Sequence, residues 1–137
     1  MVNINFDKNT FYEQKNLWEE AHIKNYKFQH KGFGSDDDNF EEIITVKNGL
    51  AKSNLENHIK IDDIYNAIEL MYLCNINNNI EKKYYYLDLR KLYVKYDKIN
   101  HIPIEIKYYW NYNYITPFVN RIFGYIINNF EIINEKD

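Results

Sequence analysis

The side chains best suited to catalysis or metal binding in this chain are four histidines and a few carboxylates. The histidines, His22, His30, His58 and His101, are scattered, and no two stand four residues apart, which is the spacing of a helical zinc site. His30 and His101 could still converge in space with Asp97 as a general acid–base set. The simpler interpretation is that these imidazoles are hydrogen-bonded within the fold or exposed at its surface. An enzyme built on these groups is therefore the third and least favoured hypothesis.

Two other features that could support catalysis or cofactor binding are incomplete. Cys74 is the only cysteine, lacks a neighbouring base and follows an apolar helical stripe, which indicates a small core residue. The segment Gly32-Phe33-Gly34 lacks the later glycine and the following helix of a phosphate-binding loop. We therefore predict no catalytic residue, no metal site and no cofactor.

The densest group of carboxylates is Asp36, Asp37 and Asp38, followed closely by Glu41 and Glu42. Oxygen ligands on a loop could hold a hard cation such as Ca²⁺, but the spacing of an EF-hand and its terminal bidentate glutamate are missing. A solvated acidic loop is the favoured interpretation. The same loop, Asp36 to Asp38, is our candidate contact for a basic partner.

Aromatic residues make up 18% of the chain, and 14 of them are tyrosines. Many lie in its second half, and alternation along a strand would put Tyr109 on the face opposite Tyr108 and Trp110. Some of these rings must then lie outside the core, where tyrosine offers an apolar body with a polar tip. We predict a surface for a protein, peptide or glycan partner, formed by Tyr93, Tyr108, Tyr109, Trp110 and Tyr112. A genome bias towards A/T-rich codons is the competing explanation.

Hydrophobic periodicity and turn residues predict the elements that must position these side chains. Asn48-Gly49 between two apolar stretches is typical of a type I′ turn closing a two-residue hairpin. Thr10 and Glu13 have the spacing of a capping box, with Trp18 as a core anchor on the helix that follows. The expected helices are about 10–24 and 61–74, and the expected strands are about 25–31, 40–47, 50–53, 91–97, 104–110 and 122–133.

The 137 residues are predicted to form one domain, 1–137, of the α+β class. Strands joined mainly by hairpins favour an antiparallel sheet, here of four to five strands, with two helices packed on one face as a two-layer sandwich. Residues 80–90 fit either a helix or a strand.

Charge and hydropathy exclude some classes of partner. The net charge is −3, with 17 basic and 20 acidic residues interspersed, so no clustered basic footprint for nucleic acid is present. No run approaches the roughly 20 apolar residues of a transmembrane helix. Met1 to Thr10 lack the apolar stretch of a signal peptide, which indicates a cytosolic protein or one whose leader has been removed.

An ordered set of landmarks spans about residues 11–133. It comprises Trp18, Asn25-Tyr26, Val46-Lys47-Asn48-Gly49, Ile61-Asp62-Asp63-Ile64-Tyr65, Val94-Lys95-Tyr96-Asp97, Pro103, Ile106 and Gly124-Tyr125-Ile126-Ile127. This set resembles a bacterial family, a domain of unknown function found in small exported proteins, many of them classed as lipoproteins. The chain departs from the family at Lys60, where Thr or Ser is usual, and at Asn100-His101-Ile102, where a glycine usually precedes the proline. The family has no established activity, so no functional residue is carried over.

Two functions from different classes follow. The resemblance and the tyrosines favour a non-enzymatic binding module of the bacterial cell envelope that uses a Tyr-rich sheet face, with a lipid anchor in a missing leader. The alternative is a cytosolic acidic protein, similar to an immunity protein or an inhibitor, that binds its partner through Asp36 to Asp38.

Overall fold

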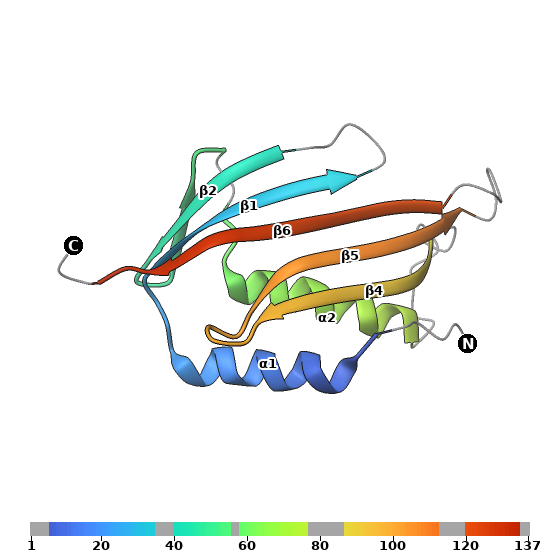
Figure 1. The fold of residues 1–137 in the computed structure, drawn as a ribbon, viewed down its shortest axis with the longest axis horizontal. Coiled ribbons are helices and arrows are strands. Elements are labelled where there is room, and N and C mark those ends of the chain that lie inside the picture. The colour runs from blue at the N-terminus through green and yellow to red at the C-terminus, as the bar shows by residue number, and fades with distance from the viewer. Residues whose placement is uncertain (1–5, 35–39, 56–57, 77–86, 113–119, 135–137) are drawn as a thin grey trace.

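The computed structural model describes residues 6–34, 40–55, 58–76, 87–112 and 120–134. Within these ranges the chain forms two helices and six strands. In chain order they are α1 (Lys8–Ala21), β1 (Tyr26–Gly34), β2 (Phe40–Lys47), β3 (Leu50–Ser53), α2 (Ile61–Ile76), β4 (Leu87–Asp97), β5 (Ile102–Tyr112) and β6 (Asn120–Ile132). Figure 1 shows the strands as one curved layer with both helices on the same side of it.

The strands form a single antiparallel sheet with the spatial order β3-β2-β1-β6-β5-β4. The predicted α+β class, with an antiparallel sheet and two helices, is therefore confirmed. The predicted number of four to five strands is too low, because the four-residue β3 joins at one edge and β6 inserts between β1 and β5. The first and last strands thus meet at the centre of the sheet.

Helix α1 begins before the predicted cap. The Asp7 side chain accepts hydrogen bonds from the Thr10 hydroxyl (2.7 Å) and the Thr10 backbone N–H (3.1 Å), so Asp7 is the N-cap. These bonds lower the pKa of Asp7. The predicted capping box of Thr10 and Glu13 is wrong, because an earlier carboxylate occupies the cap position. His22 ends the helix in the left-handed conformation, with φ 50°.

The other predicted elements are present, and their ends differ by a few residues. Helix α1 stops at Ala21 and not at 24, while α2 continues to Ile76 and not 74. Strand β4 begins at Leu87, four residues before the predicted start, so the last part of the ambiguous segment 80–90 is strand. Residues 80–86 lie outside the described residues.

The predicted Asn-Gly turn is confirmed. Asn48 and Gly49 have φ values of 52° and 77°, and they join β2 to β3 with Lys47 opposite Leu50. The Asn48 backbone N–H also donates to Asn25 Oδ1 (2.9 Å), and the Gly49 N–H donates to the Lys24 carbonyl (3.1 Å). The turn is therefore fixed to the segment that links α1 to β1.

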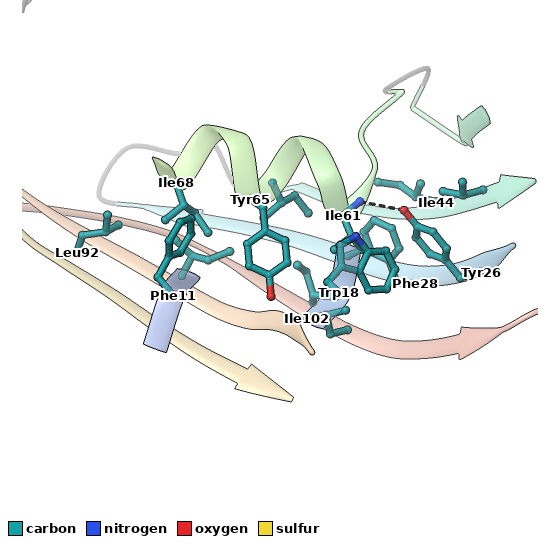
Figure 2. Packing of buried hydrophobic residues seen from close by; sticks show 14 residues of the cluster. Phe11, Trp18, Tyr26, Phe28, Ile44, Ile61, Tyr65, Ile68, Leu92 and Ile102 are labelled. Carbon is teal, nitrogen blue, oxygen red and sulfur yellow. Dashed lines mark hydrogen bonds between the residues drawn. The ribbon is translucent and has the colours of Figure 1, made fainter. Parts of the chain in front are cut away.

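The core lies between the sheet and the two helices. Trp18 of α1 is buried and packs edge-on against Tyr26 of β1, with 5.3 Å between ring centroids. Trp18 Nε1 donates to Asp62 Oδ1 (2.7 Å), and the Ile61 N–H donates to the Tyr26 hydroxyl (3.0 Å), as Figure 2 shows for the second bond. These bonds hold the first turn of α2 against both α1 and β1.

A β-bulge in β6 brings two large side chains to the helix side of the sheet. Between the pairs Lys27–Glu131 and Gln29–Asn128, β1 has one residue and β6 has two. The extra residue is accommodated by Asn129, which has φ 54°. Ile127 and Phe130 contribute to the same core although strict alternation would place them on opposite faces.

Candidate functional site

The face of the sheet that turns away from the helices, which we call the open face, is polar and rich in lysine. Cross-strand register and alternation assign to it, among the described residues, Lys27, Gln29, Lys31, Glu41, Ile43, Thr45, Lys47, Leu50, Lys52, Tyr93, Lys95, Glu105, Lys107, Ile126, Asn128 and Glu131. Lysines are twice as numerous as glutamates in this set. The described open face is therefore basic, although the whole chain carries a charge of −3.

The helix layer has the opposite balance. Helix α2 contains Asp62, Asp63 and Glu69 and no lysine or arginine. The exposed side of α1 includes Glu19 and Glu20. The two layers thus differ in the sign of the charge that they present to a partner.

A hollow of about 580 Å³ lies at the β2–β3 end of the open face. Its lining residues, which we call the lysine-rimmed hollow, are Ile43, Thr45, Lys47, Leu50, Lys52, Ser53 and Asn54. Ile43 is 48% exposed and Leu50 is 72% exposed, so two aliphatic side chains meet solvent beside two lysines. None of these lining residues is acidic, which suits an apolar ligand group that carries negative charge nearby.

Local sequence explains this arrangement. The alternation of β2 buries Ile44 and Val46 completely and leaves Ile43 and Thr45 on the open face. The type I′ turn then sets Leu50 opposite Lys47 and Lys52 opposite Thr45. The Ile43 N–H donates to Asn54 Oδ1 (2.9 Å), which ties the chain after β3 back to β2.

The structure separates two of the tyrosines that were predicted to form one binding surface. Tyr93 pairs with Lys107 on the open face and is 41% exposed, with Lys107 Nζ 6.0 Å from its ring centroid. Tyr108 pairs with the buried Leu92 and so lies on the helix side, where its hydroxyl is 3.4 Å from that of Tyr125. Burial, followed by the bond to Tyr125, raises the pKa of Tyr108.

The other three residues of that surface are described only by their backbone. Tyr109, Trp110 and Tyr112 lie in β5, where Trp110 pairs with Leu89 and Arg121. Within the described side chains, Tyr93 is the tyrosine on the open face. The acidic contact loop Asp36, Asp37 and Asp38 lies outside the described residues.

The two glutamates that follow that loop have different surroundings. Glu41 is exposed and accepts a hydrogen bond from Gln29. Glu42 is 1% exposed, and its Oε1 lies 2.9 Å from His30 Nδ1 while its Oε2 accepts from the Ser53 hydroxyl (2.8 Å). These three side chains, two of them buried and Ser53 half-buried, form a polar row across β1, β2 and β3, which we call the His30–Glu42–Ser53 row.

This row is built for structure and not for nucleophilic catalysis. The carboxylate stands between the other two groups, so Ser53 bonds to Glu42 and not to an imidazole that could take its proton. The His30 ring is also enclosed, since it stacks on Tyr125 (5.1 Å) and meets Phe40 edge-on (5.2 Å). A histidine facing a glutamate across adjacent strands, both at apolar-facing positions, was a sequence signal that could have revealed the pair.

The acid–base set of His30, His101 and Asp97 is not assembled. His101 and Asp97 share the β4–β5 turn, where the His101 N–H donates to the Asp97 carbonyl (2.7 Å) and His101 Nδ1 lies 2.9 Å from Gln14 Oε1. His30 instead contacts Glu42, Phe40 and Tyr125, and no hydrogen bond or ring contact among the described residues joins it to the turn.

The described residues contain neither a metal-binding cluster nor a membrane-spanning helix. Among these residues, no three or more His, Cys, Asp or Glu side chains gather where they could hold a metal ion. No described helix combines the length and the apolar character needed to span a membrane.

No protein-family model matches the chain, and neither a curated protein nor a solved structure shows a significant match. We therefore infer the function from the geometry of the described residues.

Proposed function

We propose that this protein is a non-enzymatic interaction module that binds an acidic partner protein through the open face of its sheet. The observation that carries the proposal is the lysine-rimmed hollow, where exposed Ile43 and Leu50 lie beside Lys47 and Lys52. Apolar side chains of the partner would fill the hollow, and its carboxylates would face the lysines.

The distribution of charge supports this choice of partner. A net acidic protein with a basic sheet face attracts acidic surfaces to that face and repels them from the helix layer. The binding surface thus moves from the predicted tyrosine cluster to the β2–β3 end of the same face. The bacterial envelope, implied by the family resemblance, is the location that we propose for this module.

A second candidate uses the other layer. An immunity-like or inhibitor-like protein would bind a basic partner, and the acidic side chains of α2, with no basic residue on that helix, favour such docking. The two candidates predict partners of opposite charge on opposite layers, so one set of surface variants separates them.

The test compares the partners captured by three forms of the folded protein. Ile43→Ser/Leu50→Ser should lose the partner of the open face, because both exposed side chains in the hollow are removed. Leu70→Ser is the matched control, since Leu70 is a 64% exposed leucine on α2. We expect Ile43→Ser/Leu50→Ser, and a further variant Lys47→Glu, to weaken capture of an acidic partner, while Leu70→Ser captures it as the wild type does.

Circular dichroism of each variant establishes that the fold is retained. Retention of the partner by Ile43→Ser/Leu50→Ser, together with its loss from Leu70→Ser, would contradict open-face binding and favour the helix layer.

A further inference from the structure

Strand β4 forms a long edge of the sheet, and no described strand pairs with its outer side. It contains 11 residues and pairs with β5 along its length, and the sheet order ends there. Figure 1 shows β4 as the outermost strand of the sheet beyond β5, with no described strand on its outer side. An edge of this kind presents backbone N–H and C=O groups that can pair with another extended chain.

A groove runs beside this edge. It has a volume of about 490 Å³ and is lined by residues 92–96 of β4, by Lys98, and by Phe6, Asp7 and Thr10 around the start of α1. On β4, Leu92 and Val94 face the helix side, opposite Tyr108 and Ile106 of β5. The groove therefore combines a strand edge with apolar side chains at every second position, which is the arrangement that binds extended peptides by strand addition.

The wall of the groove contains a hydrogen-bond donor that is not used. The Tyr96 hydroxyl is buried and has no hydrogen-bond partner among the described residues. Both carboxylate oxygens of the nearby Asp7 already accept bonds from Thr10. A buried hydroxyl without a partner is unfavourable; because this oxygen is closed to solvent, a ligand acceptor gains its bond only where entry of the ligand opens the groove around Tyr96.

The charge beside the groove decides between two occupants, a second copy of this chain and a segment of another protein. Lys95 and Lys98 are exposed at the rim, and neither makes an ion pair with a described residue; Glu105, opposite Lys95, is bonded to Lys107 instead (2.9 Å). Pairing the β4 edges of two copies would bring these like charges together, which is unfavourable. An acidic segment of another protein satisfies them.

We propose that the β4 edge binds an extended acidic segment of a partner protein as an additional strand. Alternate apolar side chains of the segment enter the groove beside Val94, and its carboxylates face Lys95 and Lys98. This site is separate from the lysine-rimmed hollow at the opposite edge, so it stands whether or not the open-face proposal is correct.

The test uses a synthetic peptide of alternating valine and glutamate, roughly eight residues long, which spans residues 92–96 at about 3.3 Å per residue. Backbone amide resonances of the ¹⁵N-labelled protein are followed during the titration. We expect the largest shifts and slowed hydrogen exchange in β4. A peptide with the same side chains that is N-methylated at every position has no N–H to donate from either edge and should not bind.

The protein variants use charge reversal at exposed positions. Lys95→Glu/Lys98→Glu should weaken peptide binding by about tenfold or more, since two favourable pairs become repulsive. Lys47→Glu/Lys52→Glu, at the opposite edge, is the matched control and should bind as the wild type does. Thermal unfolding of each variant excludes a loss of fold.

Each other outcome overturns the proposal. Shifts that map to the lysine-rimmed hollow, or equal binding of the N-methylated peptide, would show that β4 is not extended. Absence of binding at about millimolar peptide, the weak end of specific association, would show that the edge is not a peptide site. A dimer that forms through β4 without peptide would identify a second copy as the occupant.

Discussion

The two edges of the sheet are built differently. Strand β3 has four residues, and the carbonyl of Ala51 in this strand lies 2.9 Å from His58 Nδ1, which can donate to it. Strand β4 has 11 residues, a groove lies beside it, and no described strand pairs with its outer side. Short, covered edges prevent unwanted pairing, whereas a long bare edge permits it. The comparison indicates that the molecule protects one edge and leaves the other available.

The interior polar groups differ in the same way. On the β3 side, the His30–Glu42–Ser53 row satisfies its buried side chains within the fold. On the β4 side, the Tyr96 hydroxyl is buried without a described partner. We infer that the β3 side uses its polar groups for stability and that the β4 side retains one for binding.

The largest expected effect comes from breaking the row. Glu42→Ala leaves the buried His30 ring nitrogen without its carboxylate partner and removes the bond from the half-buried Ser53 hydroxyl, so it should lower the free energy of unfolding by about 3–5 kcal/mol. Glu41→Ala removes an exposed neighbour and should change it by about 1 kcal/mol or less. Urea unfolding followed by tryptophan fluorescence measures both. Similar losses in the two variants would show that the row does not hold the β3 side together.

A second effect on the β3 side tests the contact between Gly32 and Phe40. These residues are opposite each other in the β1–β2 pair, and a Cβ on Gly32 would collide with the Phe40 ring. Gly32→Ala should therefore cost about 1–3 kcal/mol of unfolding free energy. Gly49→Ala meets no atom, and its cost of about 1 kcal/mol should come from φ 77° alone.

The double variant Gly32→Ala/Phe40→Leu separates the two causes. If the collision is responsible, Gly32→Ala should cost less in the Phe40→Leu background than in the wild type. An unchanged cost would instead attribute the loss to backbone entropy or to the strand itself.

Sequence reasoning recovered the parts of this fold that depend on local pattern. Asn48-Gly49 fixed a turn because both residues adopt positive φ easily, and the apolar alternation of β2 located buried Ile44 and Val46. It missed the position of β6 between β1 and β5, since alternation shows which face a residue takes but not which strand it joins. The bulge at Asn129 was also missed, because one extra residue changes the face without changing the composition.

The candidate site was less predictable for the same reason. Tyr93 and Tyr108 were grouped by type and proximity, but the β4–β5 register sets them on opposite faces. Ile43 and Lys52 were unremarkable in sequence, and they meet only because the hairpin places β3 beside β2. Glu42 was interpreted as part of a solvated acidic run, whereas its position in β2 makes it the buried member of that run.

A smaller expected effect compares a buried tyrosine hydroxyl that has a hydrogen-bond partner with one that has none among the described residues. The Tyr65 hydroxyl donates to the His101 carbonyl (2.7 Å), whereas the Tyr96 hydroxyl has no described partner. Burial raises the pKa of both tyrosines, so both hydroxyls stay protonated. We expect Tyr65→Phe to destabilise the protein by about 1 kcal/mol and Tyr96→Phe to stabilise it by a similar amount.

Chemical denaturation of these two variants gives the sign directly. Loss of stability in both would mean that the Tyr96 hydroxyl is satisfied, which removes one support for the β4 groove. With the valine–glutamate peptide bound, Tyr96→Phe should lose affinity if the peptide accepts from that hydroxyl.

The smallest expected effect distinguishes the turns beside the two edges. In the β4–β5 turn, burial alone would raise the pKa of Asp97, but bonds from the Asn100 side chain (2.9 Å) and the Ile99 N–H (2.9 Å) together outweigh it and lower the pKa. Because the pKa of Asp97 is lower in the folded state, the ionised carboxylate stabilises the fold. This stabilisation is complete above pH 3.8, the ordinary pKa, and is lost as the pH falls through the lower pKa of the folded state. The β2–β3 turn, Asn48-Gly49, contains no carboxylate.

Amide chemical shifts recorded from pH 5 to pH 2 (about one to two units either side of the ordinary Asp pKa) test this difference. The Ile99 and Asn100 amides should move as Asp97 takes up its proton, while those of Asn48 and Gly49 should not, and Asp97→Asn should abolish the movement. The loss of stability should be roughly a few tenths of a kcal/mol, since solvent screens a turn at the surface. Parallel titration of both turns would mean that acid loosens the sheet as a whole, and the β4 side would then have no acid-sensitive turn of its own.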